Sequence, residues 1–344
     1  MLQNPLKRVN IFYEVMLNKI MYPICANTFK NWCLSNYKYG KVYHDLGEPR
    51  PFDVSLRDGL QSLTNDEQNC YTTNEKIKIY NSIKTKYNPK NIEIGSIVSE
   101  KVLPVFKDTL DLFKLIEVNQ QLHHLSYEDR ANNFILTPNQ EKMREIINIP
   151  EINNLSFITS VSNSFQKRNT KLSLHESDKD ISTMLQELDN ARCRKSCPVV
   201  KLYVSCINEC PIEGKIDNDF IVNRLLNLHK MKVDYICLSD TCGTLTVDDF
   251  EYIVDTCAYF GLPYKTLSLH LHVKKGREKE VENIIHKALD RQIIHFDVSA
   301  LDSGGCSVTM TKDKLSPNLS YELYYKSLSN YIIRKIQWDE MFLK

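Results

Sequence analysis

The chain has 344 residues, and its 44 Lys and Arg nearly balance its 43 Asp and Glu, giving a formal net charge of +1. This balance excludes a strongly basic nucleic-acid binder or a polyanionic tail as the main theme. Because no apolar run approaches the roughly 18 residues that a membrane span requires, we expect no contact with a membrane. The 42% hydrophobic content is enough for a sizeable core.

Residues 1–44 differ from the rest of the chain, with six Lys or Arg and one acidic residue, Glu14. A basic, acid-poor beginning is typical of a transit peptide, but this segment is poor in Arg and Ser and rich in aromatic residues. We interpret residues 1–44 as an N-terminal extension, either a targeting segment or an extra helix, before a single domain over 45–344. We expect an intracellular protein, either cytoplasmic or mitochondrial.

The eleven cysteines are scattered, which favours reduced, mostly buried thiols in a reducing compartment. A zinc cluster of Cys193 and Cys197 with Cys206 and Cys210 is the alternative. Its spacing is unlike that of knuckle pairs separated by a loop, and Cys206 ends an apolar, strand-like run. We therefore favour free thiols.

From residue 51 onward, short β-branched or apolar runs alternate with longer helical patterns. Eight runs are predicted as strands: 52–56, 91–94, 133–136, 155–161, 199–206, 235–239, 267–273 and 293–299. The helical patterns cover 74–87, 100–118, 140–148, 179–193, 218–232, 247–260, 276–290 and 321–336. Eight alternating pairs imply parallel strands that close into an α/β (β/α)8 TIM barrel with an N-terminal extension. An open doubly wound sheet is the alternative, weakened because no Gly-x-Gly-x-x-Gly follows a strand.

In such a barrel, chemistry takes place at the carboxyl ends of the strands. The polar residues predicted there are Arg57, Asp58, Glu93, Asp240, His270, His272 and Cys306.

His270 and His272 lie two residues apart on a predicted strand, so their imidazoles share one face. Asp58 ends the first strand and can reach the same space in a closed barrel. Two imidazoles and a carboxylate suit a divalent metal, and without a thiolate ligand we favour Mg²⁺ or Mn²⁺. The alternative is a histidine pair whose hydrogen bonds are satisfied within the protein.

Cys306 follows Gly304 and Gly305, and glycines allow a loop to bend and close over a substrate. A thiol carried into a closed site can serve as an acid or a base. A turn with an incidental cysteine is the alternative.

A set of motifs resembles the 3-hydroxy-3-methylglutaryl-CoA (HMG-CoA) lyase family of metal-dependent TIM barrels. The resemblance covers roughly residues 50–330. It rests on F-D-V-S-L-R-D-G-L-Q at 52–61, I-E-I-G-S at 92–96, L-T-P-N at 136–139, S-V-S-N-S-F at 160–165, Y-V-S-C at 203–206, C-P-I-E-G-K at 210–215, L-S-D-T-C-G at 238–243, H-L-H at 270–272 and G-G-C at 304–306.

The resemblance implies that a metal held by Asp58, His270, His272 and Asn318 helps to cleave an acyl-CoA thioester into acetyl-CoA and acetoacetate. It implies that Arg57 stabilises enolate charge and that Cys306 protonates the enolate. It further implies that Glu93 and Asp240 orient ligands or move protons, and that Lys167 and Arg168 bind the phosphates of CoA. We also expect a homodimer.

The chain departs from the family at three points. Val273 stands where the family has an acidic or amide residue. Leu315 occupies the usual position of the ligand asparagine, so Asn318 requires a three-residue shift. The loop reads D-S-G-G-C-S at 302–307, with less glycine and no proline after the cysteine.

These departures keep two further hypotheses open beside the lyase. One is a related barrel that condenses an acyl-CoA with an oxo acid. The other is a catalytically inactive barrel that binds a metal or CoA.

Overall fold

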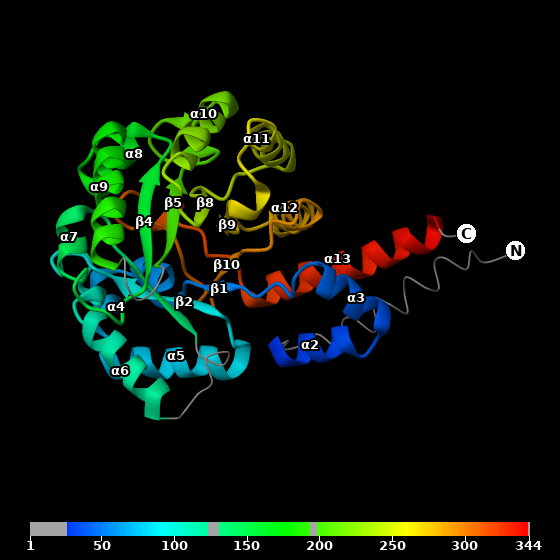
Figure 1. Cartoon of the computed structure of the whole chain (residues 1–344), viewed down its shortest axis with the longest axis horizontal. Helices are drawn as coiled ribbons and strands as arrows, with labels where there is room; N and C mark the ends of the chain where they lie inside the picture. Colours follow the sequence, from blue (N-terminus) through cyan, green and yellow to red (C-terminus); the bar gives the residue numbers. More distant parts are fainter. Residues whose placement is uncertain (1–25, 123–130, 193–197, 343–344) are drawn as a thin grey trace, which may run out of the picture.

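The computed structural model describes residues 26–122, 131–192 and 198–342. Within them, eight parallel strands form one sheet in the order β10-β1-β2-β3-β4-β5-β8-β9 (Figure 1). The strands are β1 (Phe52–Asp53), β2 (Asn91–Ser96), β3 (Asn132–Leu136), β4 (Asn154–Ser160), β5 (Val199–Ser205), β8 (Tyr235–Asp240), β9 (Leu267–Leu271) and β10 (Asp297–Val298).

The first and last strands of this order meet, which closes the sheet. The Leu269 amide of β9 donates to the His295 carbonyl at 2.9 Å, and Leu269 forms a parallel bridge with Phe296, just before β10. The predicted TIM barrel is therefore confirmed, and the open doubly wound sheet is wrong.

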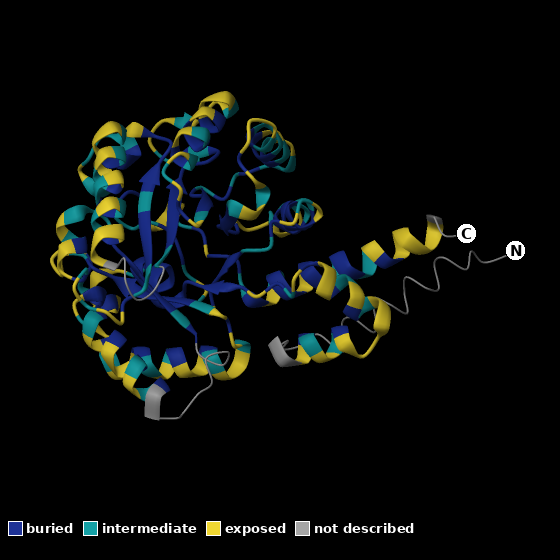
Figure 2. Ribbon diagram, in the orientation of Figure 1, coloured by how far each residue is buried: buried dark blue, intermediate teal, exposed yellow. Residues whose placement is uncertain are grey.

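Helices surround the barrel, and their outward faces are exposed while the strands are buried (Figures 1 and 2). The described helices are α2 (Ala26–Leu34), α3 (Tyr37–Asp45), α4 (Asn65–Asn69), α5 (Thr73–Tyr87), α6 (Thr109–Leu122), α7 (Gln140–Arg144), α8 (Asn163–Thr170), α9 (Leu174–Arg192), α10 (Asn218–His229), α11 (Val247–Tyr259), α12 (Glu278–Asp290) and α13 (Tyr321–Phe342). Short helical turns lie at Ser55–Gly59, Pro104–Phe106, Tyr264–Thr266 and Lys312–Lys314, and a hairpin joins β6 (Glu209–Cys210) to β7 (Gly214–Lys215).

Several predicted bounds shift for local reasons. The sixth helix begins at Thr109 rather than residue 100, after a separate turn that starts at Pro104. Helix α9 begins five residues earlier than predicted, because the Ser173 hydroxyl and the Glu176 carboxylate cap each other's backbone N–H groups. Capping chemistry therefore sets these ends more strongly than apolar periodicity does.

Residues 26–45, within the predicted extension, form α2 and α3, and residues 1–25 lie outside the described residues. The Phe29 ring lies 5.1 Å from that of Tyr325 in α13 and 5.8 Å from that of Tyr43. Cys33 is fully buried in the same core. These two helices therefore pack on the barrel through α13.

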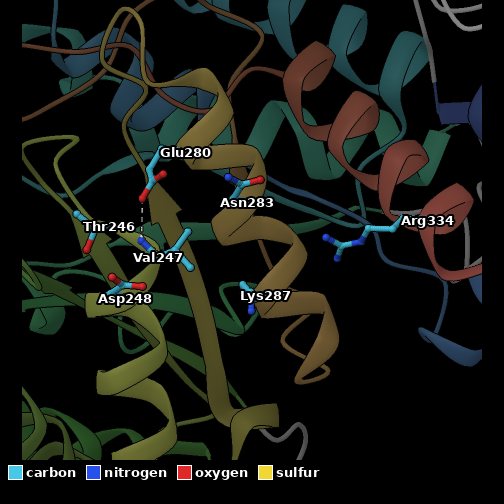
Figure 3. A pocket seen from close by; sticks show the side chains of 7 residues that line it. All are labelled: Thr246, Val247, Asp248, Glu280, Asn283, Lys287 and Arg334. Atoms are coloured by element: carbon cyan, nitrogen blue, oxygen red, sulfur yellow. Dashed lines mark hydrogen bonds between the residues drawn. The ribbon is translucent and has the colours of Figure 1, made fainter. Parts of the chain in front are cut away.

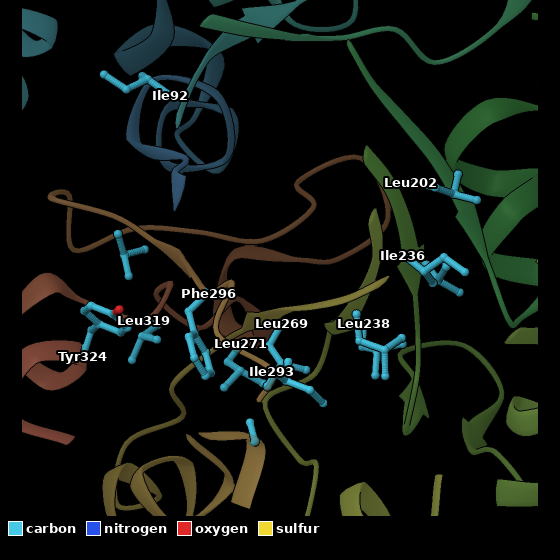
Figure 4. Close-up of a cluster of buried hydrophobic side chains, with 14 of the residues drawn as sticks. Ile92, Leu202, Ile236, Leu238, Leu269, Leu271, Ile293, Phe296, Leu319 and Tyr324 are labelled. Atoms are coloured by element: carbon cyan, nitrogen blue, oxygen red, sulfur yellow. The ribbon is translucent and has the colours of Figure 1, made fainter. Parts of the chain in front are cut away.

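The main apolar core lies between the strands and the helices (Figure 4). Leu269 and Leu271 of β9 are buried in this core together with Leu238 of β8. Because side chains alternate along a strand, His270 points to the opposite side, into the barrel. The same alternation that builds the core therefore directs polar groups to the mouth.

Candidate active site

Arg57 and Asp58 come together through a wide helical turn at Ser55–Gly59, whereas the sequence predicted a strand to residue 56. The Val54 carbonyl accepts hydrogen bonds from the Arg57, Asp58 and Gly59 amides, at 3.2, 2.9 and 3.1 Å. Adjacent residues on a strand would face opposite sides of the sheet. The turn instead lets both side chains reach one buried site.

The Arg57 guanidinium is held by two carboxylates. Its Nε donates to Glu93 Oε2 at 2.5 Å, and its Nη1 donates to Asp58 Oδ1 at 2.6 Å. The Tyr203 hydroxyl also donates to Glu93 Oε2, at 3.0 Å, and the Arg57 Cζ atom lies 4.9 Å from the Tyr203 ring centroid. Glu93 is completely buried, so it orients Arg57 from behind.

Asp58 faces the histidine pair through its other oxygen. Oδ2 accepts from the Gly305 amide at 2.9 Å and lies 3.8 Å from His270 Nε2. Burial would raise the pKa of Asp58, but the Arg57 guanidinium, with His270 and His272, lowers it below the ordinary value. Asp58 is therefore an anionic ligand group at neutral pH.

The two imidazoles approach each other through their Nε2 atoms, which lie 3.1 Å apart in His270 and His272. His270 Nδ1 lies 3.0 Å from Asp297 Oδ2, and His272 Nδ1 lies 2.9 Å from the Ser316 carbonyl oxygen. Both partners are acceptors, so these contacts assign the proton of each neutral ring to Nδ1. Two Nε2 lone pairs then face each other, an arrangement that calls for a cation between them.

The residues present therefore fit a metal ion. Asp58, His270 and His272 each offer one ligand atom, and these atoms lie within 4.8 Å of one another. Burial, followed by the proximity of His270, lowers the pKa of His272 to about 4, which keeps this ring available as a ligand at neutral pH.

Asn318 joins the same place from the segment after the glycine loop. It pairs with His272 across an antiparallel bridge, and its Nδ2 donates to the Ser303 carbonyl at 3.1 Å. Its Oδ1 is buried and has no hydrogen-bond partner among the described residues. An unpartnered buried amide oxygen suits a fourth ligand. The alternative position, Leu315, carries no ligand atom.

The glycine loop places Cys306 at the cavity. Gly305 has a φ of +98°, and its amide donates to Asp58 as described above. The half-buried Cys306 Sγ lies 3.5 Å from Asn169 Oδ1 of α8. Burial raises the pKa of the Cys306 thiol, so the thiol carries its proton at neutral pH.

Asp240 and Glu93, both predicted as catalytic, do not line the cavity. The Asp240 oxygens accept from the Thr244 and Leu245 amides, each at 3.0 Å, which holds the loop after β8. Burial raises the pKa of Asp240 to about 6. Asp240 therefore supports the loop after β8 and does not contact the cavity directly.

Lys167 and Arg168 are exposed on α8, directly before the cavity residue Asn169. Neither residue is among those that line the cavity. The cavity itself is lined by Arg57, Asp58, Gln61, Ile158, Phe165, Asn169, Tyr203, Ser205, Ser239, Thr241, His270, His272 and Cys306.

Comparisons with known proteins show which proteins this chain resembles. The chain is 25% identical to the hydroxymethylglutaryl-CoA lyase of Pseudomonas mevalonii over 74% of this chain and 77% of that protein. It is 28% identical to the mouse mitochondrial hydroxymethylglutaryl-CoA lyase over 74% and 71%. The chain matches no family model. By sequence the chain is therefore a distant relative of the hydroxymethylglutaryl-CoA lyases, similar to them over 74% of its length.

Solved structures support the barrel fold of this chain. A hydroxymethylglutaryl-CoA lyase from Pseudomonas aeruginosa aligns with a TM-score of 0.67 at 22% identity, covering 83% of this chain and 86% of that one. An HMG-CoA lyase from Acinetobacter baumannii, in complex with coenzyme A and 3-methylmalate, aligns with a TM-score of 0.64 at 23% identity, covering 79% and 80%.

Three buried residues in or behind the site were not predicted as site residues from the sequence: Asp297, Lys201 and Tyr203. Each lies within an apolar strand run, where composition alone indicates core. A charged residue inside such a run was the available signal, because lone charges are rarely buried without a partner. Lys201 and Asp297 carry opposite charges and pair with each other.

The hollow between α11, α12 and α13 (Figure 3) has mixed charge, with the Glu280 carboxylate on the Val247 amide and Lys287 paired with Glu251. Of the cysteines considered for zinc, Cys193 and Cys197 lie outside the described residues, while Cys206 and Cys210 are buried free thiols.

Among helices of the described residues, none has the length and apolar character needed to cross a membrane.

Proposed function

We propose that this chain is a metal-dependent carbon–carbon lyase that cleaves HMG-CoA, or a close 3-hydroxy acyl-CoA, to acetyl-CoA and acetoacetate. The observation that carries the proposal is that the Nε2 atoms of His270 and His272 face each other. They do so beside Asp58 and Arg57 in one cavity. Similarity to the hydroxymethylglutaryl-CoA lyases supplies the reaction class.

When bound, Mg²⁺ or Mn²⁺ supplies Lewis acidity, which makes the tertiary hydroxyl of the substrate easier to deprotonate. Asp58, His270, His272 and Asn318 would hold the ion. Once a base takes up the hydroxyl proton, the hydroxyl oxygen becomes the ketone of acetoacetate as the C2–C3 bond breaks. The electrons of that bond go to the enolate of acetyl-CoA.

Arg57 would stabilise the enolate through guanidinium donors other than those already engaged. Its fixed orientation between Glu93 and Asp58 means that little reorganisation is needed when charge develops. The protonated Cys306 thiol suits an acid that delivers the last proton to the enolate carbon. Lys167 and Arg168, exposed on α8 directly before Asn169, are the candidates for the CoA phosphates.

Val273 does not weaken this proposal. Its side chain packs in the main core, its amide donates to the Pro317 carbonyl at 2.8 Å, and it is not among the cavity-lining residues. The altered position therefore supports the strand pair that carries Asn318 rather than the cavity wall.

The test is acetoacetate release from HMG-CoA by purified protein with EDTA, Mg²⁺ or Mn²⁺. We expect release that requires the metal and falls at least about 100-fold in Cys306→Ala. The matched control is Cys70→Ala, because Cys70 is exposed and outside the cavity. Metal binding without release would contradict the lyase, and an acetyl-CoA assay with a panel of oxo acids would then test the condensing alternative by free-thiol release.

A further inference from the structure

A buried ion pair lies in the barrel interior below the histidines. The Lys201 ammonium of β5 contacts Asp297 Oδ1 of β10, and each residue is about 2% exposed. The ammonium lies 3.6 Å from the Phe52 ring centroid and 4.5 Å from that of Tyr203. The aromatic rings therefore shield this pair, and it touches neither the cavity nor the solvent.

The pair is connected to the site through the second oxygen of Asp297. That oxygen, Oδ2, lies 3.0 Å from His270 Nδ1. An ammonium group can only donate hydrogen bonds, so Lys201 fixes which way the carboxylate turns. The carboxylate in turn can only accept, so it selects the His270 tautomer that carries its proton on Nδ1. His270 Nε2 is then left with a lone pair at the site.

We propose that Lys201 is a positioning residue that acts through Asp297 to present the Nε2 lone pair of His270 to the metal. The inference rests on the metal site of the proposed function. It gives a role to a buried lysine that the lyase reaction itself does not use. Groups behind a metal ligand commonly change metal affinity about 10- to 100-fold when removed.

The chain offers a matched control for burial alone. Lys76 of α5 is also about 3% exposed and contacts the Asp108 carboxylate and the Val105 carbonyl. That pair lies outside the barrel interior and contacts none of the site residues named above. Removing either lysine takes the ammonium partner from an acid, which is buried at Asp297 and half-buried at Asp108, and should lower thermal stability. Metal affinity should respond only at Lys201.

The first experiment measures Mn²⁺ dissociation constants by electron paramagnetic resonance on the full-length protein. We expect Lys201→Met to weaken Mn²⁺ binding about tenfold and Lys76→Met to leave it within about twofold of the wild type. Equal weakening in both variants would overturn the proposal, as would unchanged affinity in Lys201→Met.

In the second experiment, removing Lys201 should strengthen Mn²⁺ binding instead of weakening it. In Asp297→Asn the ammonium still takes the amide oxygen, so the new NH₂ group faces His270 Nδ1. The His270 proton must then move to Nε2, and we expect Mn²⁺ affinity to fall about 100-fold. Adding Lys201→Met to Asp297→Asn frees the amide to turn its oxygen toward His270, so affinity should recover at least about fivefold. A double variant that binds no better than Asp297→Asn would overturn the proposal.

A readout that needs no metal separates this inference from the proposed function. Long-range ¹⁵N–¹H correlation spectra of the histidine-labelled, metal-free protein report the tautomer of His270. We expect the proton on Nδ1 in the wild type, on Nε2 in Asp297→Asn and again on Nδ1 in the double variant. If the wild type binds no Mn²⁺ yet follows this pattern, the metal site fails while the positioning role stands. An unchanged tautomer in Asp297→Asn refutes the positioning role.

Discussion

Gly304→Ala tests how the loop and Asn318 form one site. A Cβ at position 304 would lie 2.6 Å from Asn318 Nδ2 and 2.7 Å from both its Cγ and its backbone nitrogen. Ordinary contacts are about 3.5 Å, so Asn318 or the loop must move away by about 1 Å. Asn318 would then lose its bonds to the Ser303 carbonyl, at 3.1 Å from Nδ2 and 3.3 Å from the amide.

Each lost hydrogen bond is worth about 1 kcal/mol, and overpacking adds about 1–3 kcal/mol. If about 2–3 kcal/mol of this total opposes the arrangement that binds metal, affinity falls roughly 30- to 150-fold. Mn²⁺ binding and kcat/KM for acetoacetate release should fall together by this factor. Thermal unfolding, measured alongside, separates loss of the site from loss of the fold.

Gly40→Ala is the matched control, because a Cβ there finds no heavy atom closer than 3.5 Å and the residue lies within α3. It should raise stability by roughly 0.5–1 kcal/mol and leave activity unchanged. Wild-type metal affinity and turnover in Gly304→Ala would refute the reasoning, since the Cβ would then have found room beside Asn318.

Two further predictions concern pH and CoA. The folded-state pKa of His272, about 4, lies below its ordinary value of 6.5, so the unfolded chain binds more protons between these values. Stability of the metal-free protein should therefore fall as pH drops through this window, and denaturant unfolding at about pH 7 and about pH 5 should show a larger loss in the wild type than in His272→Gln. Equal losses would contradict the assignment of a buried neutral ring. For CoA, Lys167→Ala with Arg168→Ala should raise KM about tenfold with kcat within about twofold, more so at low salt, because each side chain would lose a charge-assisted contact. Lys179→Ala, on exposed α9, should change neither constant, and an unchanged KM in the double variant would remove both residues from the CoA site.

The barrel could be predicted from the sequence because each strand is a short apolar run followed by a recognisable helix. His270 and His272 could be placed together from their spacing alone. Asp58 and Arg57 were expected on a strand, and only the bonds to the Val54 carbonyl reveal the turn that brings them together. Apolar periodicity does not predict such a turn.

The supporting residues were harder to predict because their partners are distant in the chain. Lys201 and Asp297 are 96 positions apart and become meaningful only when β5 and β10 enclose one interior. Asp240 was expected to orient ligands or move protons because it ends a strand, but its oxygens accept hydrogen bonds from two nearby backbone amides. Local hydrogen bonds of this kind depend on loop conformation, which residue types alone do not specify.

The packing of α2 and α3 on α13 affects how the protein is made. Phe29, Cys33 and Tyr43 leave the ribosome long before Tyr325, their aromatic partner in the finished core. Until α13 is synthesised, these apolar faces lack the native surface that α13 provides. Nascent chains halted before residue 321 should therefore bind chaperones through residues 26–45, and chains with a complete α13 should release them.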